Sequence, residues 1–205
     1  MGSFTVESSR LAYEGIFTRI RVDDVRMPDG TVRQREVVEQ TPAVAVIPLN
    51  DDGQVTLLRQ YRHPLRRRIL EAPAGKVDVE GEEPVATAQR ELAEEAGLAA
   101  GSWELLACFH NSGGWTDERT LVYLATELHE AAPADGFQAE AEEAEMEILR
   151  IPLAVALGMV HSGDITDAKT VIGLLLTARV RPAEAGDSGV GAAEPPRMRE
   201  DIVPP

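Results

Sequence analysis

The segment between Pro84 and Gly97 limits the fold of this chain more than any other part of its sequence. Proline favours the first position of a helix, and glycine favours the position just after its end. Between these two residues, apolar side chains such as Ala88 and Leu92 recur on one side of a helix. We therefore predict an amphipathic helix over residues 84–96, with one face buried against a core.

Three glutamates share one face of this predicted helix. Glu91, Glu94 and Glu95 stand at the spacing i, i+3 and i+4, so their carboxylates project from the same side. Like charges at this spacing repel each other by roughly a few tenths of a kcal/mol per pair, and a cation placed between them reverses the sign. Such a run is otherwise typical of a solvated helical face, so the run alone leaves both interpretations open.

The residues around these glutamates fit a site for a hard cation. Gly75 and Gly81 permit a tight loop that brings backbone carbonyls close to the helix. Arg90 can brace a neighbouring carboxylate, and Glu82 lies near the positive end of the helix dipole. Oxygen ligands that leave positions for water suit Mg²⁺ or Mn²⁺, and such ions polarise phosphoryl oxygens and generate hydroxide from bound water.

The charge of the chain restricts the partners that it can bind. Its formal net charge of −15 disfavours nucleic acid and acidic membranes, because both would be repelled. A small phosphorylated substrate is compatible with this charge, since a divalent cation can link it to carboxylates. The N-terminus lacks the apolar run of a secretion signal, and no stretch approaches the roughly 18 consecutive apolar residues of a membrane span. One cysteine, Cys108, allows no intramolecular disulfide, so we expect a cytoplasmic protein.

The pattern of apolar residues predicts an α+β fold. We expect the polar residues 1–10 to be mobile. The predicted strands cover 15–22, 31–38, 43–48, 54–61, 69–73, 103–109, 120–126 and 147–151, and the predicted helices cover 84–96, 152–161 and 167–180. Strands and helices mix without regular alternation, which favours an α/β/α sandwich with a mixed β-sheet. We divide the chain into an N-terminal antiparallel β arm (1–40), a main domain (41–181) and a disordered acidic and Pro-rich tail (182–205).

The segment from Gly75 to Leu98 resembles the Nudix box. From the first box glutamate onward every fixed position is matched by the run Glu82-x7-Arg90-Glu91-Leu92-x-Glu94-Glu95-x-Gly97-Leu98. Six residues, not five, separate Gly75 from Glu82, and the extra residue lies in a loop where an insertion costs little. The resemblance implies a Nudix-type fold and a pyrophosphohydrolase that uses two to three Mg²⁺ or Mn²⁺ ions.

Short motifs outside the box resemble the ADP-ribose pyrophosphatase subfamily. They are Gln60-Tyr61-Arg62-x-Pro64, Leu70-Glu71-x-Pro73-Ala74-Gly75, Gly114-Trp115-Thr116-Asp117-Glu118, Leu121-Val122-Tyr123-Leu124-Ala125 and Glu142-Glu143-Ala144-Glu145-Met146. The resemblance implies cleavage of a nucleoside diphosphate linked to another group, with ADP-ribose giving AMP and ribose 5-phosphate. Gly113 stands where that subfamily has a proline, so other nucleoside diphosphate sugars and dinucleotides stay open as substrates.

The resemblance also assigns roles to residues of the box. Glu91 and Glu95 correspond to metal ligands and catalytic acids, and Glu94 corresponds to a further ligand or a water-positioning group. The backbone carbonyl of Ala74 corresponds to another metal ligand. The positions that shape the loop or orient the carboxylates correspond to Gly75, Glu82, Arg90 and Gly97.

A later loop acid, substrate contacts and a second subunit are implied in the same way. Glu142 and Glu143 are the favoured candidates for an acid that binds metal or activates water, and Glu145 is the third. The substrate contacts correspond to Arg62, Glu71, Trp115 and, across a subunit boundary, Arg35. Because the family's β arm commonly exchanges with a second subunit, we expect a homodimer. A non-catalytic, nucleotide-sensing Nudix domain is the alternative function, and it predicts eroded box acids, whereas this chain keeps all of them.

Overall fold

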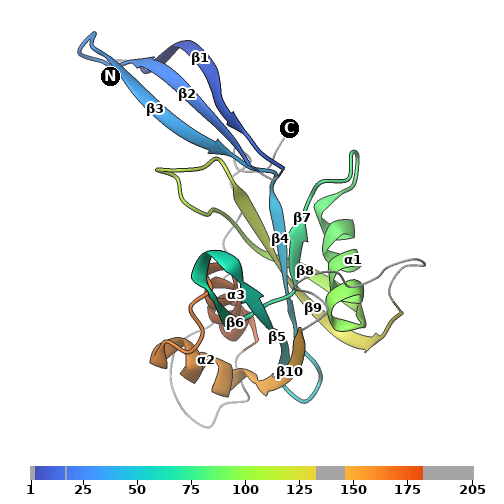
Figure 1. Ribbon diagram of the computed structural model, residues 1–205. Coiled ribbons are helices and arrows are strands. Elements are labelled where there is room, and N and C mark those ends of the chain that lie inside the picture. The colour runs from blue at the N-terminus through green and yellow to red at the C-terminus, as the bar shows by residue number, and fades with distance from the viewer. Residues whose placement is uncertain (1–2, 17, 133–145, 182–205) are drawn as a thin grey trace. The chain divides into compact units, whose positions relative to one another are not determined.

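The computed structural model describes residues 3–16, 18–132 and 146–181. The chain forms two compact units (Figure 1). The first comprises Met1–Pro42 and Phe109–Arg119, and the second comprises Ala43–Cys108 and Thr120–Pro205. None of the described helices is long and apolar enough to cross a membrane.

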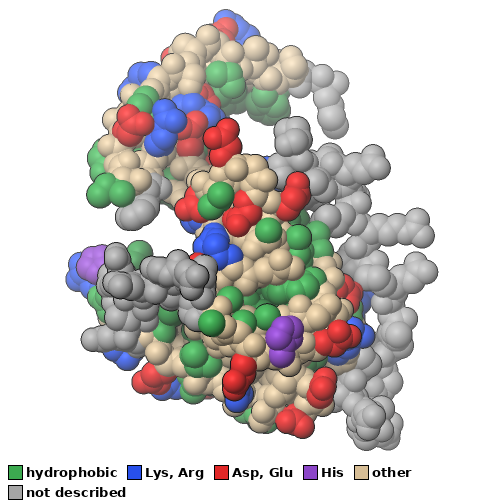
Figure 2. All heavy atoms as spheres, turned by 90° about the vertical axis from the view of Figure 1, so that its right-hand side faces the viewer, with side chains coloured by type: hydrophobic (Ala, Val, Ile, Leu, Met, Phe, Trp, Pro, Cys, Tyr) green, Lys and Arg blue, Asp and Glu red, His purple; other side chains and the backbone are tan. Residues whose placement is uncertain are grey.

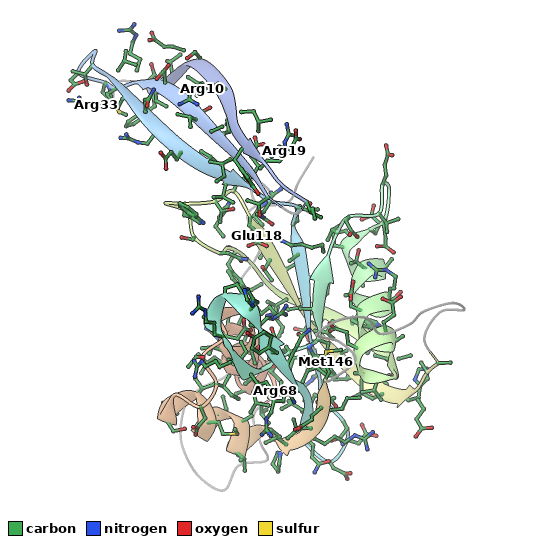
Figure 3. All side chains as sticks on the ribbon, in the orientation of Figure 1. Arg10, Arg19, Arg33, Arg68, Glu118 and Met146 are labelled. Carbon is green, nitrogen blue, oxygen red and sulfur yellow. The ribbon has the colours of Figure 1, made fainter. Side chains whose placement is uncertain are left out.

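The first unit contains a three-stranded antiparallel sheet. Its strands are β1 (Thr5–Glu14), β2 (Arg19–Arg26) and β3 (Val32–Glu39), in that order across the sheet. Side chains project from both faces of this sheet, among them Arg10 and Arg33 (Figure 3). The predicted N-terminal antiparallel arm is therefore confirmed as a fold feature.

Strand β1 corrects the expectation that residues 1–10 are mobile. The strand begins at Thr5 and pairs with β2 from Thr5↔Arg26 to Glu14↔Arg19. Two of its polar side chains bind the neighbouring strand, since the Ser8 and Ser9 hydroxyls each donate at 2.7 Å to an aspartate of β2. Polarity in this stretch thus reflects cross-strand hydrogen bonds on an exposed sheet, and it does not indicate disorder.

A loop of the first unit is fastened to the end of β3. The backbone N–H of Val38 donates to the carbonyl of Trp115 at 3.0 Å, and the Thr116 hydroxyl donates to the carbonyl of Val38 at 2.7 Å. Asn111 closes the base of the loop through a 2.5 Å hydrogen bond from its side-chain amide to Glu118. These contacts hold the Gly-rich stretch next to the arm's last strand.

The second unit is built on a four-stranded mixed sheet. Across this sheet the order is β7 (Ala74–Lys76), β4 (Ala43–Pro48), β9 (Arg119–Glu130) and β8 (Leu98–His110). Strand β4 runs parallel to β9 and antiparallel to β7. The mixed sheet predicted from the sequence is confirmed.

Helices cover both faces of this sheet. Successive side chains of a strand point to opposite faces, so an apolar strand such as β4 presents apolar side chains to a helix on each side. Val44 and Val46 of β4 lie in one buried cluster with Ala88 and Leu92 of α1 (Pro84–Ala96). On the opposite face, Gly173 of α3 (Ala168–Val180) lies close to Ile47 and Val122. This arrangement is the predicted α/β/α sandwich (Figure 1).

A second, antiparallel sheet positions residues for the candidate site. Its order is β10 (Glu147–Pro152), β5 (Gln54–Arg62) and β6 (Arg67–Glu71), and α2 (Leu153–Ser162) follows β10. A short 3-10 helix, η1 (His63–Leu65), joins β5 to β6. Arg62 thus ends one strand and Glu71 ends its neighbour.

Candidate active site

Helix α1 carries most of the acidic residues of the candidate site. It begins at Pro84 and ends at Ala96, as predicted, and Gly97 follows in the left-handed conformation with φ 64°. The Gly97 N–H donates to the Ala93 carbonyl at 3.1 Å, which closes the last turn. Since Ala88 and Leu92 are fully buried, the register of the helix is fixed by its core face. Figure 2 shows acidic and hydrophobic side chains mixed on the side from which α1 is seen.

Arg90 holds three glutamates around its guanidinium. Its Nη1 lies 2.8 Å from Glu91 Oε1 and 3.0 Å from Glu94 Oε2, and its Nη2 lies 3.7 Å from Glu82 Oε2. The Thr87 hydroxyl donates to the same Glu82 oxygen at 2.7 Å. Burial alone would lower the pKa of Arg90, but the charges of Glu91, Glu94 and Glu82 outweigh it and raise the pKa above its ordinary value.

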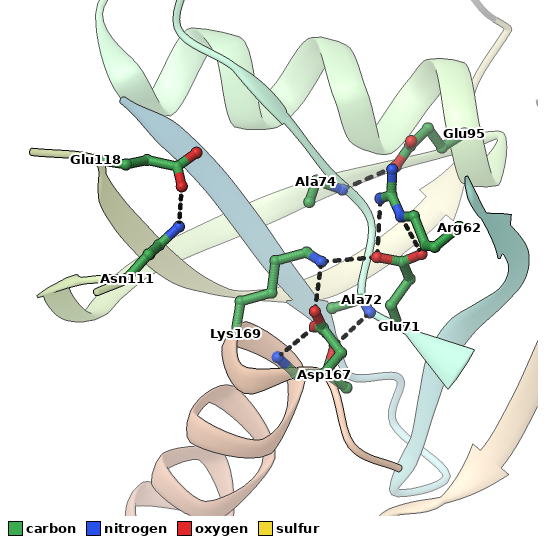
Figure 4. A network of polar contacts seen from close by, with 10 residues as sticks. Arg62, Glu71, Ala72, Ala74, Glu95, Asn111, Glu118, Asp167 and Lys169 are labelled. Carbon is green, nitrogen blue, oxygen red and sulfur yellow. Dashed lines mark hydrogen bonds and ion pairs between the residues drawn. The ribbon is translucent and has the colours of Figure 1, made fainter. Parts of the chain in front are cut away.

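Glu95 is an acid of the site whose pKa is strongly shifted. Its Oε2 accepts the backbone N–H of Ala74 at 2.8 Å (Figure 4). The pKa of this carboxyl is raised to about 8, chiefly by burial and also by the charge of Glu91, although the hydrogen bond from Ala74 acts to lower it. A largely buried acid beside a second acid is destabilised in its ionised form, and a bound cation would remove that cost.

Glycine at position 75 makes room for Glu91. A Cβ on Gly75 would lie 2.0 Å from Glu91 Oε1 and 2.1 Å from its carboxyl carbon. The Glu91 carboxylate therefore packs directly on the backbone of β7, one residue beyond Ala74. We expected the residues of β7 to form a loop, but they form a short strand. This strand contacts two box acids of α1, Glu95 through Ala74 and Glu91 through Gly75.

A partly buried ionic network, centred on the buried Glu71, lies beside Ala74 (Figure 4). Arg62 donates from Nε to Glu71 Oε1 and from Nη2 to Glu71 Oε2, each at 2.8 Å. Lys169 Nζ donates to the same Oε2 at 2.7 Å and to Asp167 Oδ1 at 3.0 Å. Burial alone would lower the pKa of Arg62, but hydrogen bonds to Glu71 and the charges of Glu71, Glu95 and Asp167 raise it above its ordinary value.

The predicted site residues fall into three groups. The second unit brings most of them together around α1 and β7, namely Arg62, Glu71, Ala74, Gly75, Glu82, Arg90, Glu91, Glu94, Glu95 and Gly97. Trp115 and Arg35 belong to the first unit, where Trp115 is 56% exposed and Arg35 lies on β3. The loop acids Glu142, Glu143 and Glu145 lie outside the described residues.

The donors around β7 and α1 fit a hard divalent cation by their chemistry. They are carboxylate oxygens and backbone carbonyl oxygens, the ligands that Mg²⁺ and Mn²⁺ take. In the described part of the chain, no three His, Cys, Asp or Glu side chains already converge as a metal cage. Their oxygens point instead to internal partners, with Glu91 and Glu94 on Arg90 and Glu95 on the amide of Ala74.

Comparison with known proteins decides the family. Residues 39–169 match the NUDIX domain, and residues 4–38 match the nucleoside diphosphate sugar hydrolase N-terminal domain. The chain belongs to the Nudix family. Nudix hydrolases act with divalent metal ions, and the predictions of family, fold class and pyrophosphohydrolase activity are confirmed.

Two curated relatives and one solved structure resemble this Nudix protein over most of their length. It is 41% identical to an ADP-ribose pyrophosphatase of Mycobacterium tuberculosis (strain ATCC 25618 / H37Rv), over 84% of this chain and 82% of the relative. It is 39% identical to an ADP-ribose pyrophosphatase of Bacillus subtilis (strain 168), over 81% and 90%. The fold matches the crystal structure of an ADP compounds hydrolase with a TM-score of 0.77 at 22% identity, covering 88% of this chain and 95% of that one.

Sequence reasoning missed the part of the network that α3 contributes. Asp167 caps α3 by accepting the N–H of Thr170 at 3.0 Å and its hydroxyl at 2.6 Å, while Lys169 reaches Glu71. One signal was present in the composition. The chain has 20 Lys and Arg residues, and only Lys76 and Lys169 are lysines. A lysine is therefore unusual in a chain that uses arginine at nearly all of these positions.

Proposed function

We propose that this Nudix enzyme hydrolyses the diphosphate bond of ADP-ribose to give AMP and ribose 5-phosphate, with Mg²⁺ as its cofactor. The observation that carries the proposal is the contact of two box acids of α1 with β7, in which Glu95 accepts the Ala74 N–H and Glu91 packs on Gly75. The two ADP-ribose pyrophosphatases at 41% and 39% identity support the choice of substrate.

The residues of the box have distinct tasks in this proposal. Glu91, Glu95 and the carbonyl of Ala74 would hold two to three Mg²⁺ ions, with Glu94 as a further ligand or a group that orients water. When bound, such ions offset the charge of the diphosphate and polarise its phosphoryl oxygens. Arg90 keeps Glu91 and Glu94 aimed in fixed directions.

The other steps fall to residues outside the box. Glu71 holds two nitrogens of Arg62, which leaves the rest of that guanidinium to bind a substrate phosphate. Glu142 or Glu143 is the proposed general base, which takes a proton from the water that attacks phosphorus. Trp115, exposed in its loop, is the proposed aromatic surface for the nucleotide.

A second substrate class is favoured by the N-terminal match. Residues 4–38 match a domain of nucleoside diphosphate sugar hydrolases, a description wider than ADP-ribose alone. Gly113 in place of the subfamily proline points in the same direction. Another nucleoside diphosphate sugar is therefore the alternative substrate.

A panel assay tests the reaction and its substrate. The protein is incubated with Mg²⁺ and ADP-ribose, other nucleoside diphosphate sugars or a dinucleotide. Alkaline phosphatase then releases inorganic phosphate from monoester products only. We expect ADP-ribose to give the highest kcat/KM, and Glu95→Gln to lower kcat by about a hundredfold or more, the order seen when one charge-stabilising group is lost.

Glu147→Gln is the matched control, because Glu147 is an exposed glutamate on β10 whose partner Arg59 lies on the surface. It should leave kcat unchanged. No turnover of any compound, or equal activity of Glu95→Gln and the wild type, would contradict the enzyme proposal. A preference for a different nucleotide sugar would replace only the substrate.

We further propose that two chains form a homodimer through the N-terminal sheet. Every residue of β1 is exposed, and its apolar side chains include Val6, Leu11 and Tyr13. A small sheet with apolar residues in water gains stability when a partner covers it. Arg35 would then contact the substrate of the other subunit. The cytoplasmic location stays a prediction, based on the single cysteine and on the pattern of apolar residues described in the sequence analysis.

A further inference from the structure

We propose that Lys169 is a positioning residue of the reaction, which acts through Glu71 to fix the direction of the Arg62 guanidinium. The proposal rests on the proposed function, in which Arg62 binds a phosphate of the substrate. It assigns a task to α3, an element that lies outside the Nudix box in sequence and contributes none of the predicted site residues.

Glu71 needs two cations because it is buried. Its side chain is 1% exposed, so its charge has almost no help from water. Arg62 covers one edge of the carboxylate with two hydrogen bonds at 2.8 Å, and Lys169 completes Oε2 at 2.7 Å. With both cations in place, Oε1 of Glu71 accepts one hydrogen bond and Oε2 accepts two.

The first turn of α3 fixes Lys169 in turn. Asp167 binds Nζ through Oδ1 and caps the helix through Oδ2, which accepts the N–H and the hydroxyl of Thr170. The Thr170 hydroxyl also accepts the backbone N–H of Ala72 at 2.8 Å. The turn therefore contacts the end of β6 twice, once through the backbone of Ala72 and once through the side chain of Glu71.

Lysine suits this position better than arginine. The planar fork of Arg62 already occupies both oxygens of Glu71, so the second cation must approach as a single point donor. An ammonium group can do so, whereas a second guanidinium would compete for the same plane. This accounts for a lysine here in a chain that otherwise uses arginine for almost every basic position.

The consequence lies on the free side of Arg62. Its side chain is 40% exposed although its Nε and Nη2 are bound. Among the described residues, Nη1 donates no hydrogen bond, so it is available to a ligand beside Glu95. If Lys169 is removed, Oε2 of Glu71 depends on Arg62 alone, and the guanidinium can turn away from the direction that the substrate requires.

The test is a double-mutant cycle on KM. Lys169→Met keeps the length of the side chain and removes its charge, and we expect KM for ADP-ribose to rise roughly tenfold, as for a lost hydrogen bond to a charged group. The Mg²⁺ concentration for half-maximal activity should change much less. In a Glu71→Gln background, where the charge that Lys169 balances is gone, the same substitution should change KM by less than about twofold.

Thr177→Val is the matched control on α3. Its hydroxyl is buried and has no hydrogen-bond partner among the described residues, so KM should stay at the wild-type value. If Lys169→Met does not fold, Lys169→Arg keeps the charge and takes its place in the cycle, with a rise in KM that again disappears with Glu71→Gln. An equal rise in both backgrounds, or no rise in the wild type, would overturn the proposal.

A measurement without turnover separates this proposal from the proposed function. The Arg62 Nε–H gives an NMR signal that is identified by its loss in Arg62→Lys. We expect this signal to shift and to exchange faster with water in Lys169→Met, and to stay unchanged in Thr177→Val. An unchanged signal in Lys169→Met would refute the role of Lys169, whereas a changed signal in a protein that cleaves no substrate would refute only the proposed reaction.

Discussion

Glu91 and Gly75 show how one missing side chain can shape a site. The Glu91 carboxylate occupies the space that a Cβ at position 75 would need, at 2.0 Å from its Oε1. The atoms that a Cβ at position 75 would meet belong to the flexible Glu91 side chain, and this side chain can move aside without disturbing the core. Position 75 therefore controls the direction of an acid more than it controls stability.

We expect Gly75→Ala to fold and to lose activity. The added methyl group forces Glu91 away from β7, and a displacement of this size costs about a hundredfold in kcat/KM when it misplaces a reacting group. Steady-state kinetics at saturating Mg²⁺ and thermal unfolding measure the two effects. Gly158→Ala on α2 is the control, because a Cβ there meets nothing within 4 Å. A Gly75→Ala enzyme with wild-type kcat/KM would contradict this account.

Residues of the site differ in how far the sequence reveals them. The common face of Glu91, Glu94 and Glu95 follows from local helix geometry, so spacing alone predicts it. The contact between Lys169 and Glu71 joins residues 98 positions apart, and no local pattern encodes such a pairing. Glu142 and Glu143 could be named only by resemblance, and they lie outside the described residues.

Elements whose ends are marked by residues such as proline and glycine are predicted best. Helix α1 has its predicted bounds because Pro84 and Gly97 mark its ends by conformations that these residues favour. Strand β1 was misjudged because its polar residues find their partners on β2, which the sequence of β1 alone does not show. Strand β7 has three residues, too few for an alternating pattern to be recognised.

The contact between α3 and the central sheet leads to a prediction about two helical glycines. At Gly173 an added Cβ would lie 2.6 Å from Ile47, so we expect Gly173→Ala to destabilise the fold by about 1–3 kcal/mol through overpacking. Gly158→Ala should instead stabilise by up to about 1 kcal/mol, since α2 has free space there and alanine favours a helix. Urea unfolding of both variants gives the two values. Destabilisation of equal size in both would show that packing on Ile47 is not the cause.

At the scale of the whole molecule, the exposed N-terminal sheet predicts the oligomeric state. Leu11→Lys places a charge on β1, and we expect it to weaken the dimer by roughly tenfold or more, as for loss of an apolar anchor. Sedimentation velocity over a range of concentrations measures the change. Val155→Lys is the matched control, because Val155 is an equally exposed apolar residue on α2. A wild-type protein that stays monomeric would reject the proposed homodimer.

The division into arm, main domain and tail stays a prediction in its finer bounds. The first compact unit ends at Pro42 and also includes Phe109–Arg119, a segment distant in sequence that no pattern of consecutive residues indicates. The tail, 182–205, lies outside the described residues. Long-range attachment of a loop to Val38 is the physical reason for the difference.

The parallel pairing of β4 with β9 has a consequence for the order of folding. The two strands align from Ala43↔Thr120 to Pro48↔Ala125, so the centre of the main sheet cannot close until more than half of the chain is available. The strands β1 to β3 pair with their immediate neighbours and can form as soon as they are synthesised. During synthesis, β4 therefore waits without β9 as an apolar strand with unpaired backbone groups on that edge, and this interval is when the nascent chain is most exposed to aggregation.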